Sequence, residues 1–243
     1  MIWKVINAEI TGTSHKKSGT KCQDVTKKLV TDNCCTIVLA DGAGSAALSE
    51  IGAELTCESV VKIFHQNFDA LFDMDCSLAK TKIIHSIRTR LGIKAKRLNR
   101  KKDELASTLL FVSIKDSKYI VGHIGDGVIG TINEKGDVFA LSEPENGEFA
   151  NTTYFTTSKN YKSHLRLYKG KVDNYNSFFL MSDGAADCLF HKKQKAFAPA
   201  IRAFSSWMET YDEESVNKAL LENMTKMFPI HTTDDCSFIM CKK

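Results

Sequence analysis

Short apolar runs separated by turn residues cover much of the chain, and stretches with helical spacing of apolar residues interrupt them. The β-branched run at 34–40 has the length and composition of a buried strand. The other segments that we predict to be strands are 2–10, 107–114, 119–124, 128–132, 138–141, 177–181 and 235–241. Short turns separate the strands between 107 and 141, and this spacing predicts an antiparallel meander.

Amphipathic periodicity predicts helices at 45–68, 77–100, 196–208 and 212–227. Ser45 is the expected N-cap of the first helix. We interpret the basic end of the second helix as a solvated face rather than a docking site for an acidic partner. The polar stretch 142–163 is expected to be a long loop. Strands at both ends with helices between them indicate an α+β fold of layered antiparallel sheets. The chain shows no linker or repeat, so we expect one domain over 1–243.

The composition is that of a globular protein, since 43% of the residues are hydrophobic and 26% are charged. The net charge of +4 gives no reason to expect binding to nucleic acid or to a membrane surface. No apolar stretch approaches the ~20 residues that span a bilayer, and the first residues lack the pattern of a signal peptide. The eight cysteines have no CxxC spacing and are interpreted as buried free thiols, so we expect a cytoplasmic protein.

Several aspartates stand where apolar runs end. Three of these runs lead directly into an Asp-Gly pair, at Asp41, Asp126 and Asp183. Such an Asp is held by a rigid strand yet faces a loop, and the Gly lets a ligand approach the backbone. One Asp-Gly pair alone is a common turn, but several in this arrangement predict a site for Mg²⁺ or Mn²⁺, which prefer carboxylate and carbonyl oxygens. Asp24 is a further candidate ahead of the run at 34–40.

The pair Asp234-Asp235 precedes the last predicted strand. Neighbouring residues of a strand point to opposite faces, so only one of these two carboxylates is expected to reach the same site. We select Asp234, with Asp235 as the alternative.

Taken in order, these motifs resemble those of the metal-dependent protein phosphatases of the 2C type, in particular their short bacterial branch. The resemblance covers nearly the whole chain and rests on the segments 12–15 with 22–24, 38–44, 106–110 with 122–127, 178–184 and 233–237. It implies a four-layer αββα sandwich in which helix pairs flank two antiparallel sheets. It also implies that 142–163 is the variable flap of this family.

The resemblance assigns a role to each candidate ligand. Asp41 matches the carboxylate shared by two metal ions, and the carbonyl of Gly42 matches the backbone ligand beside it. Asp183 and Asp234 match the other carboxylates on the first ion, and Asp24 matches an acidic residue at the second. Asp126 matches a ligand of a third, weaker ion. The implied cofactors are two Mn²⁺ or Mg²⁺ ions, or three.

The implied activity is hydrolysis of phosphoserine and phosphothreonine by a water that the two ions activate. Asp41 and Asp183 would act through that water. The implied partners are phosphorylated proteins, including a cognate Ser/Thr kinase or its targets, with no nucleic acid and no membrane, and the implied state is a monomer.

The sequence also departs from the family pattern. Many relatives carry a phosphate-binding Arg shortly before the N-terminal acidic residue, but 14–21 contains none. His15 and Lys16, or Lys17, are the candidate replacements, unless the segment is a solvated basic loop. Ala43 stands where eukaryotic relatives have a His general acid, which leaves protonation of the leaving group to water. Gln23 stands where some relatives have a second acid.

These departures leave two alternatives open. The first is an inactive pseudophosphatase that binds a phosphoprotein or a regulatory protein. The second is a metal-stabilised interaction module within a kinase-linked signalling set. His123, beside Gly-Asp, is expected to be a packed or surface residue rather than a catalytic one.

Overall fold

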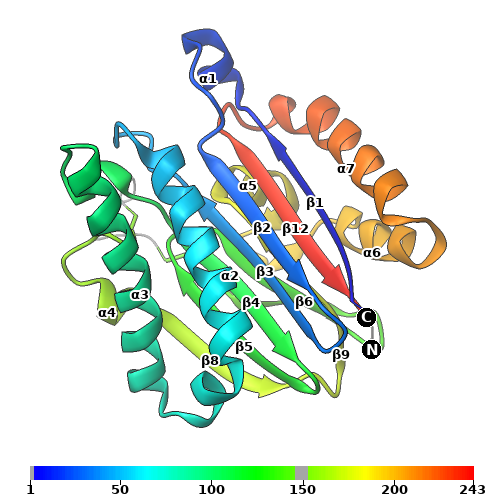
Figure 1. Cartoon of the computed structure of the whole chain (residues 1–243). Helices are drawn as coiled ribbons and strands as arrows, with labels where there is room; N and C mark the ends of the chain where they lie inside the picture. The colour runs from blue at the N-terminus through cyan, green and yellow to red at the C-terminus, as the bar shows by residue number, and fades with distance from the viewer. Residues whose placement is uncertain (1–2, 146–152) are drawn as a thin grey trace.

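The computed structural model describes residues 3–145 and 153–243, and over these ranges the chain forms two five-stranded antiparallel sheets. Sheet A has the order β1 (Lys4–Ile10), β12 (Cys236–Lys242), β9 (Tyr175–Met181), β6 (Val128–Asn133) and β7 (Val138–Ser142). Sheet B has the order β2 (Asp24–Val30), β3 (Cys34–Asp41), β4 (Leu109–Lys115), β5 (Lys118–Ile124) and β8 (Arg166–Lys171). Each sheet therefore combines strands from distant parts of the sequence, and the two chain ends meet at β1 and β12 (Figure 1).

Helices cover the outer face of each sheet (Figure 1). The pair α2 (Ser49–Asp73) and α3 (Cys76–Arg97) packs on sheet B, and α6 (Ala200–Thr210) with α7 (Glu213–Met227) packs on sheet A. This arrangement confirms the four-layer αββα sandwich expected from the sequence.

Aromatic contacts mark the three apolar layers between these elements. Phe64 of α2 meets Phe111 of β4 at 5.0 Å between ring centroids. Phe204 of α6 meets Phe238 of β12 at 5.5 Å. Tyr119 of β5 lies 5.4 Å from Phe178 of β9, measured between ring centroids. This contact joins the inner faces of the two sheets. Burial of such rings is the main favourable contribution to layered packing.

The predicted meander is wrong at its centre. β4 pairs with β5 and β6 pairs with β7, but β5 and β6 belong to different sheets. The chain crosses between the sheets at Gly125, whose φ is +116°. A Cβ at this position would lie 2.7 Å from the Cγ2 atom of Thr108, so both the backbone angle and the space favour glycine. The crossing places Asp126 at the edge shared by the two sheets.

Helix boundaries also differ from the prediction. α2 begins at Ser49 rather than Ser45, and Ser45 is an exposed turn residue that caps nothing. The backbone at 43–48 is held instead by hydrogen bonds to other segments, such as Leu48 N–H to the carbonyl of Glu104 at 2.9 Å. α2 runs on to Asp73 through Asn67, which has non-helical angles. α6 begins only at Ala200, because 196–197 pairs with 190–191 in a small hairpin.

Several elements lay outside the prediction: β2, β8, α1 (Thr13–Ser18), α4 (Tyr161–His164), α5 (Asp183–Leu189), β10 (Phe190–His191), β11 (Ala196–Phe197) and the 3₁₀ turns Lys102–Leu105 and Phe228–Ile230. The expected loop 142–163 is only partly a loop, since it includes the last residue of β7 and the first three residues of α4. Its residues 146–152, and the first residue of the predicted strand 2–10, lie outside the described residues.

In the described part of the chain, no helix combines the length and the apolar character needed to cross a bilayer. All eight cysteines are free thiols; Cys76 is exposed, and five of the others are buried. The five buried thiols agree with the prediction of buried free cysteines, and the exposed Cys76 departs from it.

Candidate active site

Three of the Asp-Gly segments converge at one edge of the two sheets. Asp41 ends β3, Asp126 lies in the crossing between β5 and β6, and Asp183 begins α5 directly after β9. One carboxylate oxygen from each of the three lies within 4.8 Å of the others. A divalent cation that takes oxygen ligands fits such a group.

A cavity of about 180 Å³ opens at this cluster. It is lined by the three clustered carboxylates and by Asp234, Asp235, His15, Gln23, Gly42, Ala43, Gly44, Thr108, Thr153 and Phe155. No Lys or Arg is among these described residues, so the lining is strongly acidic. The candidates Asp41, Gly42, Asp126, Asp183 and Asp234 therefore share one cavity.

Asp24 lies behind this cavity and does not line it. It is 2% exposed and pairs in register with Asp41. Neither of its carboxylate oxygens has a hydrogen bond of good geometry, although the hydroxyls of Ser182 and Ser237 are close enough to favour its charged form. A buried carboxylate without a partner is costly, and a cation or its waters would offset that cost. The unpaired Asp24 therefore fits the metal site that the family resemblance implies.

Burial, and after it repulsion between neighbouring carboxylates, raises the pKa values of these aspartates. Burial, followed by Asp24 and Asp183, raises the pKa of Asp41 well above its usual range. The pKa of Asp183 rises to about 6 through burial and then through Asp126 and Asp234. Burial also raises the pKa of Asp126, and it raises that of Asp24 to about 8. Clustered carboxylates with raised pKa values require either protons or cations.

The backbone around Asp41 is fixed on both sides. Its N–H donates to the hydroxyl of Thr108 at 2.8 Å, and the Thr108 N–H donates to its carbonyl at 2.8 Å. The N–H of Gly42 donates to the carbonyl of Gln23 at 3.1 Å. A Cβ at Gly42 would lie 2.9 Å from that same carbonyl oxygen, which leaves no room for a larger residue. These contacts hold the Asp41 carboxylate and the Gly42 backbone at the cavity.

Asp234 and Asp235 have different environments. Asp234 is exposed and lines the cavity. Asp235 is 3% exposed, and its carboxylate accepts hydrogen bonds from Gly12 N–H at 2.7 Å, Gln23 N–H at 2.6 Å and His15 Nδ1 at 2.9 Å. These donors occupy the oxygens of Asp235, which favours Asp234 as the ligand. In the sequence, only the position of Asp235 beside a candidate ligand pointed to this residue.

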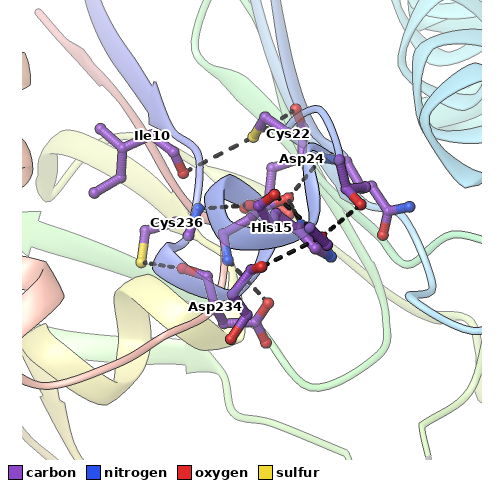
Figure 2. Close-up of polar contacts among 12 residues, drawn as sticks. Ile10, His15, Cys22, Asp24, Asp234 and Cys236 are labelled. Carbon is purple, nitrogen blue, oxygen red and sulfur yellow. Dashed lines mark hydrogen bonds and ion pairs between the residues drawn. The ribbon is translucent and has the colours of Figure 1, made fainter.

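His15 belongs to α1, which lies against the segment before β12 (Figure 2). Ser14 N–H donates to the carbonyl of Thr233 at 3.1 Å, and a Cβ on Gly12 would lie 2.3 Å from the carbonyl carbon of Asp234. This close approach brings His15 to the cavity wall. Lys16 is exposed and is not among the described residues that line the cavity.

Sequence reasoning missed the residues that come from 153–158. Thr153 and Phe155 line the cavity, and the Thr153 hydroxyl donates to the Asp126 carboxylate. Arg88 of α3 holds the following residues by donating to the carbonyls of Thr156 at 2.7 Å and Ser158 at 3.2 Å. The sequence of 153–158 has no helical or strand periodicity that would have pointed to these residues.

His123 is fully buried, and its Nδ1 accepts a hydrogen bond from Arg166 at 2.9 Å and lies 2.9 Å from the hydroxyl oxygen of Ser142. Burial, followed by the charge of Arg166, lowers its pKa well below the usual range. A packed His123 agrees with the expectation from the sequence. Cys22 and Cys236 near the site have pKa values raised above the usual range by burial, which keeps both as thiols at neutral pH.

Comparisons with known proteins point to one family. The sequence profile of protein phosphatase 2C matches residues 11–225. Serine/threonine-protein phosphatase 3 of Escherichia coli K12 is 27% identical over 175 residues, which covers 69% of this chain and 68% of that protein.

Solved structures share the fold. Serine/threonine phosphatase Stp1 from Staphylococcus aureus aligns with a TM-score of 0.63 at 15% identity and covers 100% of this chain and 95% of its own. The catalytic domain of the serine/threonine protein phosphatase PstP, solved with two manganese ions, aligns with a TM-score of 0.67 at 9% identity over 99% of this chain and 98% of its own. The family profile spans most of the sequence and the fold agrees with it, so the chain belongs to the protein phosphatase 2C family.

Proposed function

We propose that the protein is a metal-dependent phosphatase that hydrolyses phosphoserine and phosphothreonine in proteins. The observation that carries this proposal is the convergence of Asp41, Asp126 and Asp183 at one acidic cavity, with the unpaired Asp24 behind it. Family membership and the name of the E. coli relative support the same activity.

We assign the ligands as the family motif implies. Asp41 and the Gly42 carbonyl would bind two ions, Mn²⁺ or Mg²⁺. Asp183 and Asp234 would complete the first ion's shell, Asp24 would serve the second, and Asp126 would bind a third. When bound, the ions supply positive charge that polarises the phosphoryl group and activates a water.

The chain's own residues then bind and orient the substrate. His15 is the cavity residue suited to contact the phosphoryl oxygens, while the exposed Lys16 could reach them only from the rim. Ala43 lines the cavity but has no proton to give, so the leaving oxygen takes its proton from water. Thr153 and Phe155 would contact the substrate segment beside the phosphoryl group.

The proposed substrates are phosphorylated proteins, including a cognate Ser/Thr kinase or its targets. The proposed unit is a monomer with a single domain over 1–243, acting in the cytoplasm. The net charge of +4 offers no basis for a nucleic-acid partner.

The test is phosphate release from a phosphothreonine peptide with Mn²⁺ and with a chelator. We expect turnover only with metal, and loss of at least about a hundredfold in Asp41→Asn and Asp183→Asn, because each removes a charged ligand. Asp32→Asn is the matched control, since Asp32 is an exposed residue of the turn between β2 and β3. Full activity of Asp41→Asn would contradict the proposal.

The absence of an Arg in 14–21 favours one alternative, a pseudophosphatase that binds phosphoproteins. The same assay separates the two functions. A protein that binds Mn²⁺ and a phosphopeptide but releases no phosphate would be the binding module.

A further inference from the structure

The carboxylate of Asp235 joins two distant parts of the chain at the cavity. Its Oδ1 accepts the N–H of Gly12, and its Oδ2 accepts the N–H of Gln23 and the Nδ1 of His15. The two backbone donors leave the carboxylate little freedom to rotate. The acceptor that His15 meets is therefore fixed by the backbone, not by another mobile side chain.

This hydrogen bond decides which nitrogen of His15 faces the cavity. An ionised carboxylate is only an acceptor, so Nδ1 must carry the proton in the 2.9 Å contact. The other ring nitrogen, Nε2, is then the one available to a ligand. His15 is 22% exposed and lines the cavity, whereas Asp235 is 3% exposed.

The orientation of His15 matters because its ring can carry a positive charge in an otherwise acidic cavity. Among the described residues that line the cavity, His15 is the one side chain able to carry a positive charge. The ring protonated at both nitrogens donates from Nδ1 to Asp235 and from Nε2 to an oxygen of a phosphoryl group. Hydrogen bonds between charged partners are roughly twice as strong as neutral ones.

We propose that Asp235 is a positioning residue that holds His15 with Nε2 toward the cavity, where His15 binds the phosphoryl group in place of the family's Arg. This inference rests on the proposed function, since it assumes that the cavity receives a phosphoryl group. It adds Asp235 to the substrate-binding apparatus and gives it no metal-binding role.

Binding of inorganic phosphate to the Mg²⁺-loaded full-length protein, measured by calorimetry, tests the proposal without turnover. His15→Asn keeps an amide N–H near Nδ1 for Asp235 but has nothing at Nε2. We expect it to weaken phosphate binding about tenfold, because a charge-assisted hydrogen bond is lost. Asp235→Asn should weaken binding similarly, and the double variant should be no weaker than His15→Asn, because coupled residues are not additive.

A second measurement reports which ring nitrogen of His15 carries the proton. Nitrogen-15 NMR of the Mg²⁺-loaded protein should show His15 with Nδ1 protonated in the wild type, and with the proton shared between the two nitrogens in Asp235→Asn. Unchanged phosphate affinity in His15→Asn would overturn the proposal. So would a wild-type His15 whose Nδ1 is unprotonated, a result that holds even if Asp235→Asn does not fold.

Failure of this proposal is distinguishable from failure of the proposed function. A protein that turns over phosphopeptides while His15→Asn binds phosphate normally would refute the positioning role alone. A protein that shows the expected phosphate and NMR changes but no turnover would support the positioning role and refute the proposed activity. Mg²⁺ affinity, measured in the same titrations, should be unchanged in His15→Asn.

Discussion

Asp24, the first residue of β2, lies directly opposite Asp41, the last residue of β3, in the antiparallel register of sheet B. Like charges in directly opposed positions destabilise a sheet, and here burial adds to the penalty. The two carboxylates therefore make the metal-free fold less stable than its packing would allow, and cations at the cavity would remove that strain.

The first prediction concerns pH. The folded-state pKa of Asp24 is about 8 and that of Asp183 about 6, both above the ~3.9 of an unfolded Asp. From the unfolded pKa of ~3.9 up to the folded pKa values, the folded state binds more protons than the unfolded state. The free energy of unfolding therefore falls as pH rises through this range. In a chelator, the melting temperature should decrease from pH 5 to pH 8, and added Mn²⁺ should restore it at pH 8. A melting temperature that rises over this range would contradict the pKa directions.

The second prediction removes the charge of Asp24. Asp24→Asn should increase the free energy of unfolding of the metal-free protein at pH 8, on the order of 2 kcal/mol, because a neutral amide costs less to bury. The same variant should bind Mn²⁺ more weakly. Urea unfolding in a chelator measures the first effect and calorimetry the second. A variant less stable than the wild type without metal would show that Asp24 already has adequate partners.

The third prediction tests the contact between the N-terminal and C-terminal motifs. Gly12→Ala should destabilise the protein by roughly 2 kcal/mol or more, because its Cβ would lie 2.4 Å from the Thr233 carbonyl oxygen. It should also weaken Mn²⁺ binding by shifting Asp234. Gly92→Ala is the control, since a Cβ there meets nothing within 4 Å and Ala favours the helix by up to ~1 kcal/mol. Equal stability of the two variants would refute the close approach.

The fourth prediction concerns the segment after Thr153. Arg88 donates to two carbonyls of this segment and stacks over Tyr161 with its guanidinium carbon 3.9 Å from the ring centroid. Arg88→Ala should raise the KM for a phosphopeptide several-fold while Mn²⁺ affinity stays constant, because it frees a cavity wall but no ligand. Arg97→Ala, at an exposed position near the end of the same helix, is the control. If both variants have wild-type KM, the segment does not contact the substrate.

The apolar pattern predicted layered antiparallel sheets and the convergence of three Asp-Gly segments, because both depend on short apolar strands with clear ends. The four-layer αββα order was implied by the family resemblance. β2 was missed because one side of this edge strand is solvated and its Lys residues interrupt the apolar pattern. The crossing at Gly125 was missed because sheet membership depends on long-range pairing, which local turn signals do not encode. Asp235 and Arg88 form hydrogen bonds with backbone groups of segments that are distant in the sequence. The spacing of residues along the chain does not predict such contacts.

We propose that Asp24, Asp41, Asp183 and Asp234 serve one metal centre. The most direct measurement is a crystal structure of the protein soaked in Mn²⁺, with anomalous scattering recorded at the manganese edge. We expect two anomalous peaks in the cavity, both within coordination distance of Asp41, with Asp183 and Asp234 near one of them. Peaks away from Asp41, or an empty cavity at millimolar Mn²⁺, would contradict it.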